Sequence, residues 1–341
     1  MTIPNRIAGA PWAIVVADDH GFDSGLPSCC DGRAAPVQYC QLNGTRTLFQ
    51  DSLQRAMRVA PASQVIVTAL DAYRLHWEPA SWFIPPEHRF VSTETGMSWL
   101  TTAAAILAVA YNAPDSIVTL LPGRCFVSHE SILAEAMDRA VSLLPRVPEA
   151  VISLGMQDLD GGIDEDYLVP LKGERQFLQP LLGVARRPIP WIAQYLRSEG
   201  ALVASRVTCS YARTLAAHIA LVWPGLASRL LEHIRAGTRK CANGGVRMHV
   251  PNGLPRAMLR SRHWYPPALP QRALRVTACG WSGLQSARAV ARIRSYLCPP
   301  LQDLPGGAPS PGGRIGTAKA KDATTAGIGR ASQAAAMPFN D

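Results

Sequence analysis

The residues of this sequence best suited to chemistry are carboxylates and arginines that follow short apolar runs. Asp18 and Asp19 come directly after the apolar residues 12–17, and Arg124 follows a second such run. Carboxylates can ligate a divalent cation, whereas a guanidinium binds phosphate oxygens through paired hydrogen bonds. A metal site at Asp18-Asp19-His20 would need a third ligand from elsewhere in the chain, so we expect a solvated loop there.

Other familiar catalytic and metal-binding motifs are absent from the sequence. None of the eight cysteines forms a C-x-x-C pair, which argues against a zinc or iron–sulfur site and favours small buried apolar residues. No hydrolase elbow, zincin or P-loop motif occurs. His76, Glu78, Glu87 and His88 surround two tryptophans, a pattern more typical of a polar surface loop with aromatic anchors than of a catalytic cluster.

The charge is unevenly distributed along the chain. The net charge is +9, but residues 1–181 carry −8 and residues 182–300 carry +16, almost entirely from arginine. Such a basic segment indicates either an anionic partner or docking against the acidic half of the same chain, and both remain open. A phosphorylated small molecule and nucleic acid are both candidates. Specific nucleic-acid binding is the less favoured, because the segment has no helix-turn-helix, RNA-stacking motif or zinc finger.

Strands and helices alternate through the first half of the chain. Apolar periodicity predicts strands over 12–17, 64–69, 88–92, 116–121 and 150–154, with helices over 47–59, 98–111 and 129–144. This order is typical of an α/β fold with β-α-β units, a parallel sheet and helices on both faces. Ligands of such sheets bind at the carboxyl ends of the strands. We therefore expect the site in the loops 18–37, 70–80, 92–98 and 122–128.

The pattern is weaker in the second half of the chain. It predicts helices over 190–197, 211–222 and 224–234 and an extended segment over 201–207. We expect an α/β domain over residues 1–235, then an irregular basic connection over 236–272. Residues 273–298 would add a final strand and helix to the same domain. Residues 299–341, rich in proline and glycine, are predicted to be a disordered tail.

Five segments of the chain, in order, resemble motifs of the sugar-phosphate nucleotidyltransferases, most closely the mannose-1-phosphate guanylyltransferases. PVQYCQLNGTRTLFQDSL, from Pro36, is similar to their PKQF…L.G..SLLQ..L element. The others are WAIVVADDHGFDS at the AGGxGTRL loop, VTLLPGRCFVSHE at VVLPSDH, VARRP and GALVAS at VEKP and GALWNS, and CGWSGLQS at GWSDLGS. The resemblance covers roughly residues 12–297. It implies a Rossmann-like nucleotidyltransferase fold with a mixed, mostly parallel sheet.

The resemblance also implies where ligands would bind. In this family a sugar 1-phosphate oxygen attacks the α-phosphate of a nucleoside triphosphate, and two aspartates hold the metal ion. The nucleotide side would be formed by Ala17, Asp18, Asp19, Gly21 and Gln38. The sugar-phosphate side would be formed by Tyr167, Arg187 and Gly200.

Several positions depart from the family's pattern where its chemistry needs them. Arg124 and Gly283 stand at the two metal aspartates, so no metal is expected at these positions. Val37 replaces the lysine of PKQ, whereas Arg187 keeps the positive charge of the lysine in EKP. Asp18 is one of the carboxylates that stand where the family has its glycine loop. The electrostatic repulsion between a carboxylate and a phosphate ~4 Å apart is about 4 kcal/mol at an effective dielectric constant of ~20. Losing even one group that stabilises developing charge typically costs ~10²–10³ in rate.

We therefore favour a nucleotidyltransferase-like protein whose catalysis is impaired or lost, and which binds a nucleotide, a sugar phosphate or a protein partner. One alternative is an active transferase with a rearranged site, in which Asp18, Asp19 or Asp23 holds Mg²⁺ and Arg124 or Arg187 binds phosphate. Another is a basic module that docks on nucleic acid or another anionic partner. No cofactor is expected, and Mg²⁺ only if the protein is active.

Membrane insertion and assembly can also be considered from the sequence. No apolar run approaches the ~18–20 residues of a membrane span, and the first apolar run lacks the basic flank and length of a secretory signal. We therefore expect a cytoplasmic protein with no membrane partner. The hypothesis of lost catalysis includes a homo-oligomer, or a hetero-oligomer with an active relative.

Overall fold

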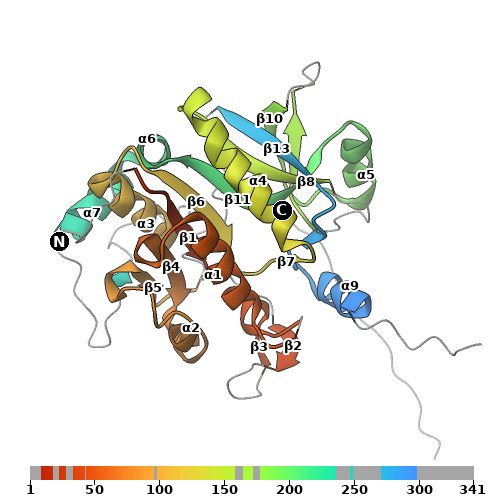
Figure 1. The fold of residues 1–341 in the computed structure, drawn as a ribbon, viewed down its shortest axis with the longest axis horizontal. Coiled ribbons are helices and arrows are strands. Elements are labelled where there is room, and N and C mark those ends of the chain that lie inside the picture. The colour runs from red at the N-terminus through yellow and green to blue at the C-terminus, as the bar shows by residue number, and fades with distance from the viewer. Residues whose placement is uncertain are drawn as a thin grey trace, which may run out of the picture. The chain divides into compact units, whose positions relative to one another are not determined.

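A computed structural model gives the arrangement of these segments (Figure 1). It describes residues 9–17, 23–27, 34–42, 44–95, 98–157, 164–171, 177–235, 246–248 and 270–297. All of them belong to one compact unit, Met1–Pro299. The predicted tail over 299–341 lies outside the described residues, as do Asp18, Asp19 and Gly21.

The first half of the chain forms the parallel part of a ten-stranded mixed sheet, whose strand order is β12-β5-β4-β1-β6-β11-β8-β13-β10-β9. Its central strands are β1 (Trp12–Val16), β4 (Val65–Leu70), β5 (Arg89–Ser92) and β6 (Ile117–Pro122). β1 pairs in parallel with both β4 and β6. The α/β class predicted from alternating strands and helices is confirmed, and the carboxyl ends of these strands meet at one edge.

The second half of the sheet curls into a ring. Its strands are β8 (Val151–Gln157), β9 (Tyr167–Pro170), β10 (Leu178–Ala185), β11 (Leu202–Tyr211) and β13 (Gln271–Thr277). β9 pairs antiparallel with both β10 and β11, so the order β11-β8-β13-β10-β9 closes on itself. The antiparallel pairings of the sheet all involve β9, β10 or β11.

The interior of this ring has its own small apolar cluster. Leu168, Leu202, Ala204 and Ala273 are buried together there. Gly155 on β8 makes room for them, because a Cβ at this position would lie 2.6 Å from Leu202 Cδ1. The ring is therefore filled by side chains and has no open channel through this cluster.

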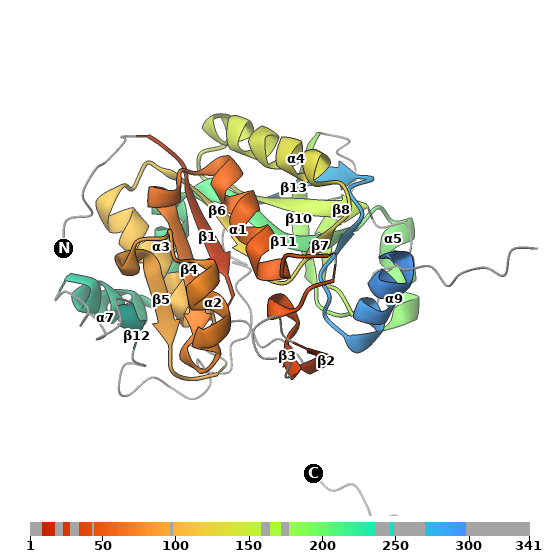
Figure 2. The same ribbon diagram turned by 60° about the horizontal axis from the view of Figure 1, so that its bottom comes forward.

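Helices cover both faces of the sheet, as Figures 1 and 2 show together. α1 (Leu48–Val59) and α4 (Glu130–Leu143) pack on one face. α3 (Ser98–Asn112), α6 (Ala212–Val222) and α7 (Pro224–Arg235) pack on the other. Separate apolar clusters lie on the two sides of the strands. The sheet is thus the middle layer of a three-layer α/β unit.

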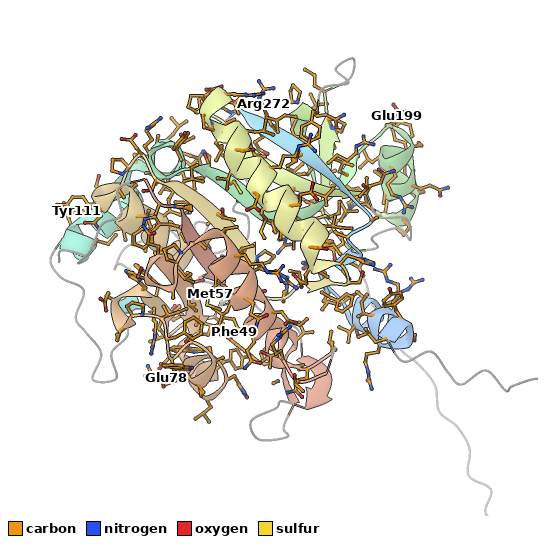
Figure 3. All side chains as sticks on the ribbon, viewed as in Figure 1. Phe49, Met57, Glu78, Tyr111, Glu199 and Arg272 are labelled. Atoms are coloured by element: carbon orange, nitrogen blue, oxygen red, sulfur yellow. The ribbon has the colours of Figure 1, made fainter. Side chains whose placement is uncertain are left out.

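Local sequence explains why α1 begins where it does. The Thr47 hydroxyl accepts a hydrogen bond from the Gln50 N–H at 3.2 Å, and Gln50 Oε1 accepts one from the Thr47 N–H at 2.8 Å. This capping box satisfies two N–H groups that lack a partner within the helix. Phe49 of the first turn is fully buried, whereas Met57 near the end of α1 is exposed (Figure 3).

The remaining elements are short and connect or flank these layers. The strands are β2 (Asp23–Pro27), β3 (Ala34–Pro36), β7 (Phe126–Val127), β12 (Val246–Met248) and β14 (Trp281–Ser282). The helices are α2 (Arg74–Ala80), α5 (Pro190–Ser198) and α9 (Ala287–Leu297). Single 3₁₀ turns occur at Val37–Tyr39, Ala62–Gln64, Asp71–Tyr73, Pro86–His88 and Leu144–Arg146.

Two sequence predictions about irregular segments need correction. The connection over 236–272 contains β12, which pairs in parallel with β5 at the sheet edge, and β13 already begins at Gln271. A three-residue strand that depends on a distant partner leaves no local periodicity to read. The expected loop 70–80 contains α2, which Trp77 anchors by donating its indole N–H to the Leu70 carbonyl at 2.8 Å.

Two further predictions concern membranes and cysteines. In the described part of the chain, none of the helices combines the length and the apolar character that a bilayer crossing requires. Cys40, Cys125, Cys209 and Cys279 are buried, as expected of small apolar residues.

Candidate functional site

The nucleotide side expected from the sequence centres on the end of β1. Gln38 donates its side-chain amide to the Ala17 carbonyl at 3.2 Å, so these two predicted residues lie together. The Gly123 N–H donates to the Val16 carbonyl at 2.8 Å, and a Cβ on Gly123 would approach this same oxygen to 2.8 Å. The turn after β6 is thus pressed against the end of β1, which places Arg124 beside the nucleotide side.

Val37, at the position of the family's lysine, serves packing alone. It is fully buried in a small apolar cluster with Leu48, Phe126 and Val290. Val290 belongs to α9, so this cluster fastens the last described helix to the loop before α1. The position therefore contributes no charge to the site.

Three arginines come together at the carboxyl edge of the strands, and we call Arg124, Arg187 and Arg206, with Asp166 and Gln285, the arginine cluster. Arg124 Nη2 donates to Gln285 Oε1 at 2.5 Å, and Arg187 Nη2 donates to the same oxygen at 3.3 Å. Arg206 Nη2 lies 3.4 Å from Asp166 Oδ2. The backbone N–H of Arg187 donates to Asp166 Oδ1 at 3.2 Å.

Two of these arginines have an unusual, left-handed backbone conformation. Arg187 follows β10 with φ +36°, and Arg206 lies in a bulge of β11 with φ +63°. Left-handed backbone is unfavourable for residues other than glycine, so the surrounding structure must hold it. At the bulge, Ser205 does this, since its hydroxyl donates to the Leu154 carbonyl at 2.7 Å and accepts from the Val207 N–H at 3.1 Å.

Glu165 brings a buried carboxyl group to the same place. Its side chain is 5% exposed, and burial raises its pKa to about 8 against the opposing effect of Arg206 and Arg124. Its oxygens stand 2.6 and 2.8 Å from the point where a Cβ on Gly283 would be. A carboxyl group from another part of the chain therefore occupies the space in which an aspartate at 283 would begin.

The arginine cluster suits an anion. Among the described residues here, the guanidinium groups of Arg124, Arg187 and Arg206 lie near the carboxyl groups of Asp166 and Glu165, and burial raises the pKa of Glu165 to about 8. Arg124 is 6% exposed, whereas Arg187 is exposed and can reach a ligand. Guanidinium groups in this number bind carboxylates or phosphates through charge-assisted hydrogen bonds.

The same residues do not fit a divalent cation. The described residues contain no group of three His, Cys, Asp or Glu side chains that could hold a metal ion. Arg124 and Arg206 lie beside Glu165 and would repel a cation there. We therefore derive no step through a metal. Of the three aspartates proposed as alternative metal ligands, Asp18 and Asp19 lie outside the described residues, and Asp23 is the first residue of β2.

The remaining predicted site residues are placed differently. Tyr167 is 1% exposed and packs in the main core, directly after Asp166 of the arginine cluster. Gly200, with φ +88°, follows α5 and lines a cavity of about 430 Å³. The structure thus brings Arg124 and Arg187 together on Gln285, whereas Gly200 borders the cavity.

The histidines and acids around the two tryptophans do not form one cluster. His76 stacks on Tyr39 with ring centroids 5.4 Å apart. His88 is buried edge-on against Trp12 at 5.3 Å, and this burial lowers its pKa. Trp82 is 77% exposed. The predicted polar surface loop with aromatic anchors is therefore wrong for His88, which is buried, and for Trp82, which is exposed.

The fold and site geometry define an α/β protein with the fold of the sugar-phosphate nucleotidyltransferases, as the resemblance implied. The chain is similar to a crystal structure described as mannose-1-phosphate geranyltransferase from Thermus thermophilus, with 18% identity over 84% of this chain and 79% of that one and a TM-score of 0.63. It is also similar to mannose-6-phosphate isomerase from Helicobacter pylori, with 11% identity over 80% and 99% of the two chains and a TM-score of 0.59. No protein-family model matches the sequence, and no curated protein matches it. At these identities the likeness concerns the fold.

Adding one methyl group at Gly283 is expected to destabilise the protein. In Gly283→Ala the Cβ would meet Glu165 Oε1 at 2.6 Å and the Trp281 ring at 2.8 Å. We expect the free energy of unfolding to fall by about 1–3 kcal/mol, as for other overpacked sites. Gly225→Ala on α7 is the control, because nothing lies within 4 Å of its Cβ position. Equal urea midpoints for the two variants would contradict the close contact with Glu165.

Proposed function

We propose that this protein binds a sugar phosphate or nucleotide sugar at the arginine cluster, and that it is impaired or inactive as a nucleotidyltransferase of the mannose-1-phosphate guanylyltransferase type. The observation that carries the proposal is the convergence of Arg124 and Arg187 on the single oxygen of Gln285. An amide oxygen carries no full negative charge, whereas a phosphate bound between the same two guanidinium groups would supply one.

The different exposures of the three arginines indicate from which side a phosphate would enter the cluster. Arg187 is the exposed member, so it would meet the ligand first, while the buried Arg124 and the half-buried Arg206 line the inner side. Asp166 accepts the backbone N–H of Arg187 and thereby holds its position. A nucleotide would extend from the cluster toward Ala17 and Gln38 at the end of β1.

Impaired catalysis is supported by the residues at two positions of this chain. At both, the resembled family has an aspartate that holds the metal ion. Arg124 carries a positive charge at one, and Gly283 has no side chain at the other. Nucleotidyl transfer needs the charge of the reacting phosphates to be neutralised and their orientation fixed, which a metal ion does by bridging them. A single buried guanidinium supplies charge but cannot bridge two phosphates in this way.

Glu165 favours a second candidate, an active transferase with a rearranged site. Its carboxyl group occupies the space beside Gly283, so a carboxylate is available where the sequence pattern lacks one. In this candidate Glu165 would act in its ionised form, at a pH above its pKa of about 8. Nucleotide-sugar synthesis that appears only in alkaline solution and is lost in Glu165→Gln would favour it.

Binding can be tested with a matched pair of arginine variants. We expect GDP-mannose to bind the purified protein in calorimetry, and Arg187→Gln to weaken this binding by roughly 10- to 100-fold, the loss of one or two charge-assisted hydrogen bonds. Arg146→Gln, an exposed arginine after α4, is the control and should bind like the wild type. Equal affinities for the two variants would contradict a phosphate site at the cluster.

The catalytic part of the proposal needs a separate measurement. Pyrophosphate release from GTP and mannose 1-phosphate, with and without Mg²⁺, should be near background in the purified protein. Robust turnover at neutral pH would overturn the proposed impairment while leaving the binding site intact. GTP should bind at most weakly, and its affinity should not depend on Mg²⁺, since the described residues do not fit a metal.

A further inference from the structure

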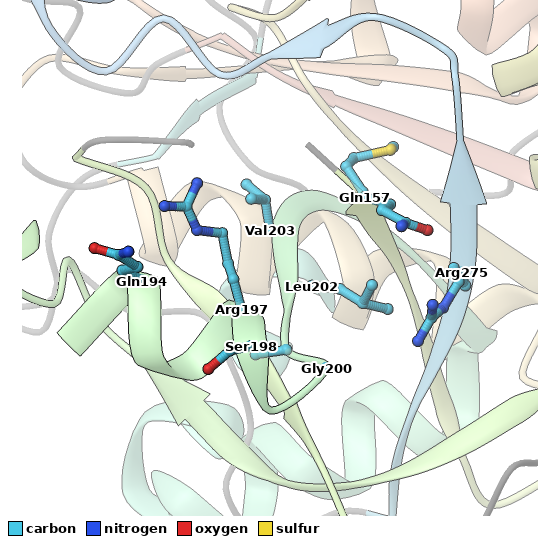
Figure 4. Close-up of a pocket in the computed structure, with 10 residues that line it drawn as sticks. Gln157, Gln194, Arg197, Ser198, Gly200, Leu202, Val203 and Arg275 are labelled. Carbon is cyan, nitrogen blue, oxygen red and sulfur yellow. The ribbon is translucent and has the colours of Figure 1, made fainter. Parts of the chain in front are cut away.

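A cavity of about 430 Å³ lies between α5 and β13, beside the carboxyl end of β8 and the amino end of β11 (Figure 4). Gln194 and Arg197 border it from α5, and Gln157 and Arg275 border it from the ends of β8 and β13. Leu202 lies between these two sides. The volume is within the range of small-molecule sites and is sufficient for a substituted monosaccharide.

The polar lining of this cavity is cationic. Arg197 and Arg275 both border it, and none of its lining residues is acidic. Within the described part of the chain, neither guanidinium forms an ion pair with a carboxylate. Two arginines that face one cavity without a carboxylate between them repel each other, and an anionic group bound there would relieve this repulsion.

The rest of the lining suits a sugar ring. The amides of Gln157 and Gln194 can each donate to and accept from hydroxyl groups. Leu202 and Val203 are buried and give the cavity an apolar surface of the kind on which the C–H face of a sugar ring can pack. Charged, hydrogen-bonding and apolar groups are thus combined in a single cavity.

The cavity adjoins the arginine cluster through the pairing of β9 and β11. Val203, which lines the cavity, pairs with Tyr167, the residue after Asp166. The next residue of β11, Ala204, donates its backbone N–H to the Asp166 carbonyl at 2.8 Å. The lining of the cavity and the arginine cluster thus include neighbouring residues of the same pair of strands.

We propose that the cavity binds the sugar part of the ligand and that this sugar itself carries a negative charge, a carboxylate or a second phosphate, which Arg197 and Arg275 recognise. This inference rests on the proposed binding of a sugar phosphate at the arginine cluster. It specifies the ligand class further: an acidic sugar 1-phosphate or a sugar bisphosphate.

Three probes of nearly equal size separate these ligand classes in calorimetry: glucose 1-phosphate, glucuronic acid 1-phosphate and glucose 1,6-bisphosphate. We expect at least one of the two doubly anionic probes to bind tenfold or more tightly than glucose 1-phosphate. If glucuronic acid 1-phosphate binds more tightly than glucose 1,6-bisphosphate, the second charged group of the ligand is a carboxylate. If the bisphosphate binds more tightly, the group is a phosphate. Arg275→Gln and Arg197→Gln should each remove most of the preference over glucose 1-phosphate, whereas Arg146→Gln, outside the cavity, should retain it.

The outcomes distinguish the two proposals. If all three probes bind equally and Arg187→Gln weakens all of them, the phosphate site stands and the acidic-sugar inference is wrong. If no probe binds, and GDP-mannose does not bind either, the proposed function itself fails. A preference for the doubly anionic probes that survives in both cavity variants would also overturn the inference, because it would place their second charge elsewhere.

Discussion

Arg55→Met is expected to lower the free energy of unfolding by about 3 kcal/mol, a large loss for one side chain. Arg55 of α1 is 2% exposed and pairs with Glu130 of α4, with Nη2 2.6 Å from Oε1. Its Nη1 also donates to the Cys125 carbonyl at 3.2 Å and the Ser52 hydroxyl at 3.3 Å. Methionine fills a similar volume but leaves these acceptors without their donor. Because Glu130 is one-third exposed and can turn toward water, we expect less than the full cost of a stranded buried charge.

The matched control for this variant lies one turn further along the same helix. Arg58 is exposed and makes one hydrogen bond, to the Glu130 carbonyl at 3.3 Å. Arg58→Met should therefore change the free energy of unfolding by no more than about 0.5 kcal/mol. Urea titrations of both variants measure the difference. If Arg55→Met were no more destabilising than Arg58→Met, the buried ion pair would not be important for the fold.

Arg55 also links this fold element to the site. The Cys125 carbonyl that it binds belongs to the residue directly after Arg124. Losing this bond should loosen the turn between β6 and β7 and allow Arg124 to leave Gln285. We therefore expect Arg55→Met to weaken sugar-phosphate binding even at temperatures where the protein remains folded, whereas Arg58→Met should not.

The layered part of the fold could be predicted because its information is local. Each buried parallel strand is a continuous apolar run, as Val65–Leu70 is, and each covering helix has a 3.6-residue pattern, as Leu48–Val59 has. The closed ring could not be predicted, because β9 has four residues and depends on two distant partners. β10 alternates weakly, with partly exposed residues along its whole length. Neither strand has enough local signal to be read alone.

The candidate site divides in the same way. Arg124 and Arg187 were found because they replace charged residues in recognisable motifs. Arg206 was missed because only the bulge in β11 turns it toward Asp166, and a bulge has no signature in one sequence. Gln285 lies in the segment CGWSGLQS and Glu165 lies two residues before the predicted site residue Tyr167, so their positions were visible but their roles were not. The contact of Glu165 with Gly283 joins segments far apart in the chain, which only the folded structure brings together.

Replacing Glu165 by glutamine should remove a large part of the pH dependence of stability. The carboxyl pKa is about 8 in the folded protein against 4.5 in the reference state, so the folded protein holds a proton that the unfolded chain releases. The stability associated with this proton is complete below pH 4.5 and is lost as the pH rises through 8. Integrated over this window, the loss is up to about 5 kcal/mol. Glutamine is neutral at every pH and should not show it.

The measurement is a series of urea titrations of wild type and Glu165→Gln from pH 5 to pH 9. We expect glutamine to become progressively more favourable relative to the wild type as the pH rises. Groups that titrate in both proteins cancel in this difference, including His218, whose pKa burial lowers to about 4 and whose contribution is lost on the acid side. Parallel curves would show that Glu165 is ionised throughout. In that case the arginine cluster would carry one more negative charge at neutral pH, and phosphate binding would have to overcome it.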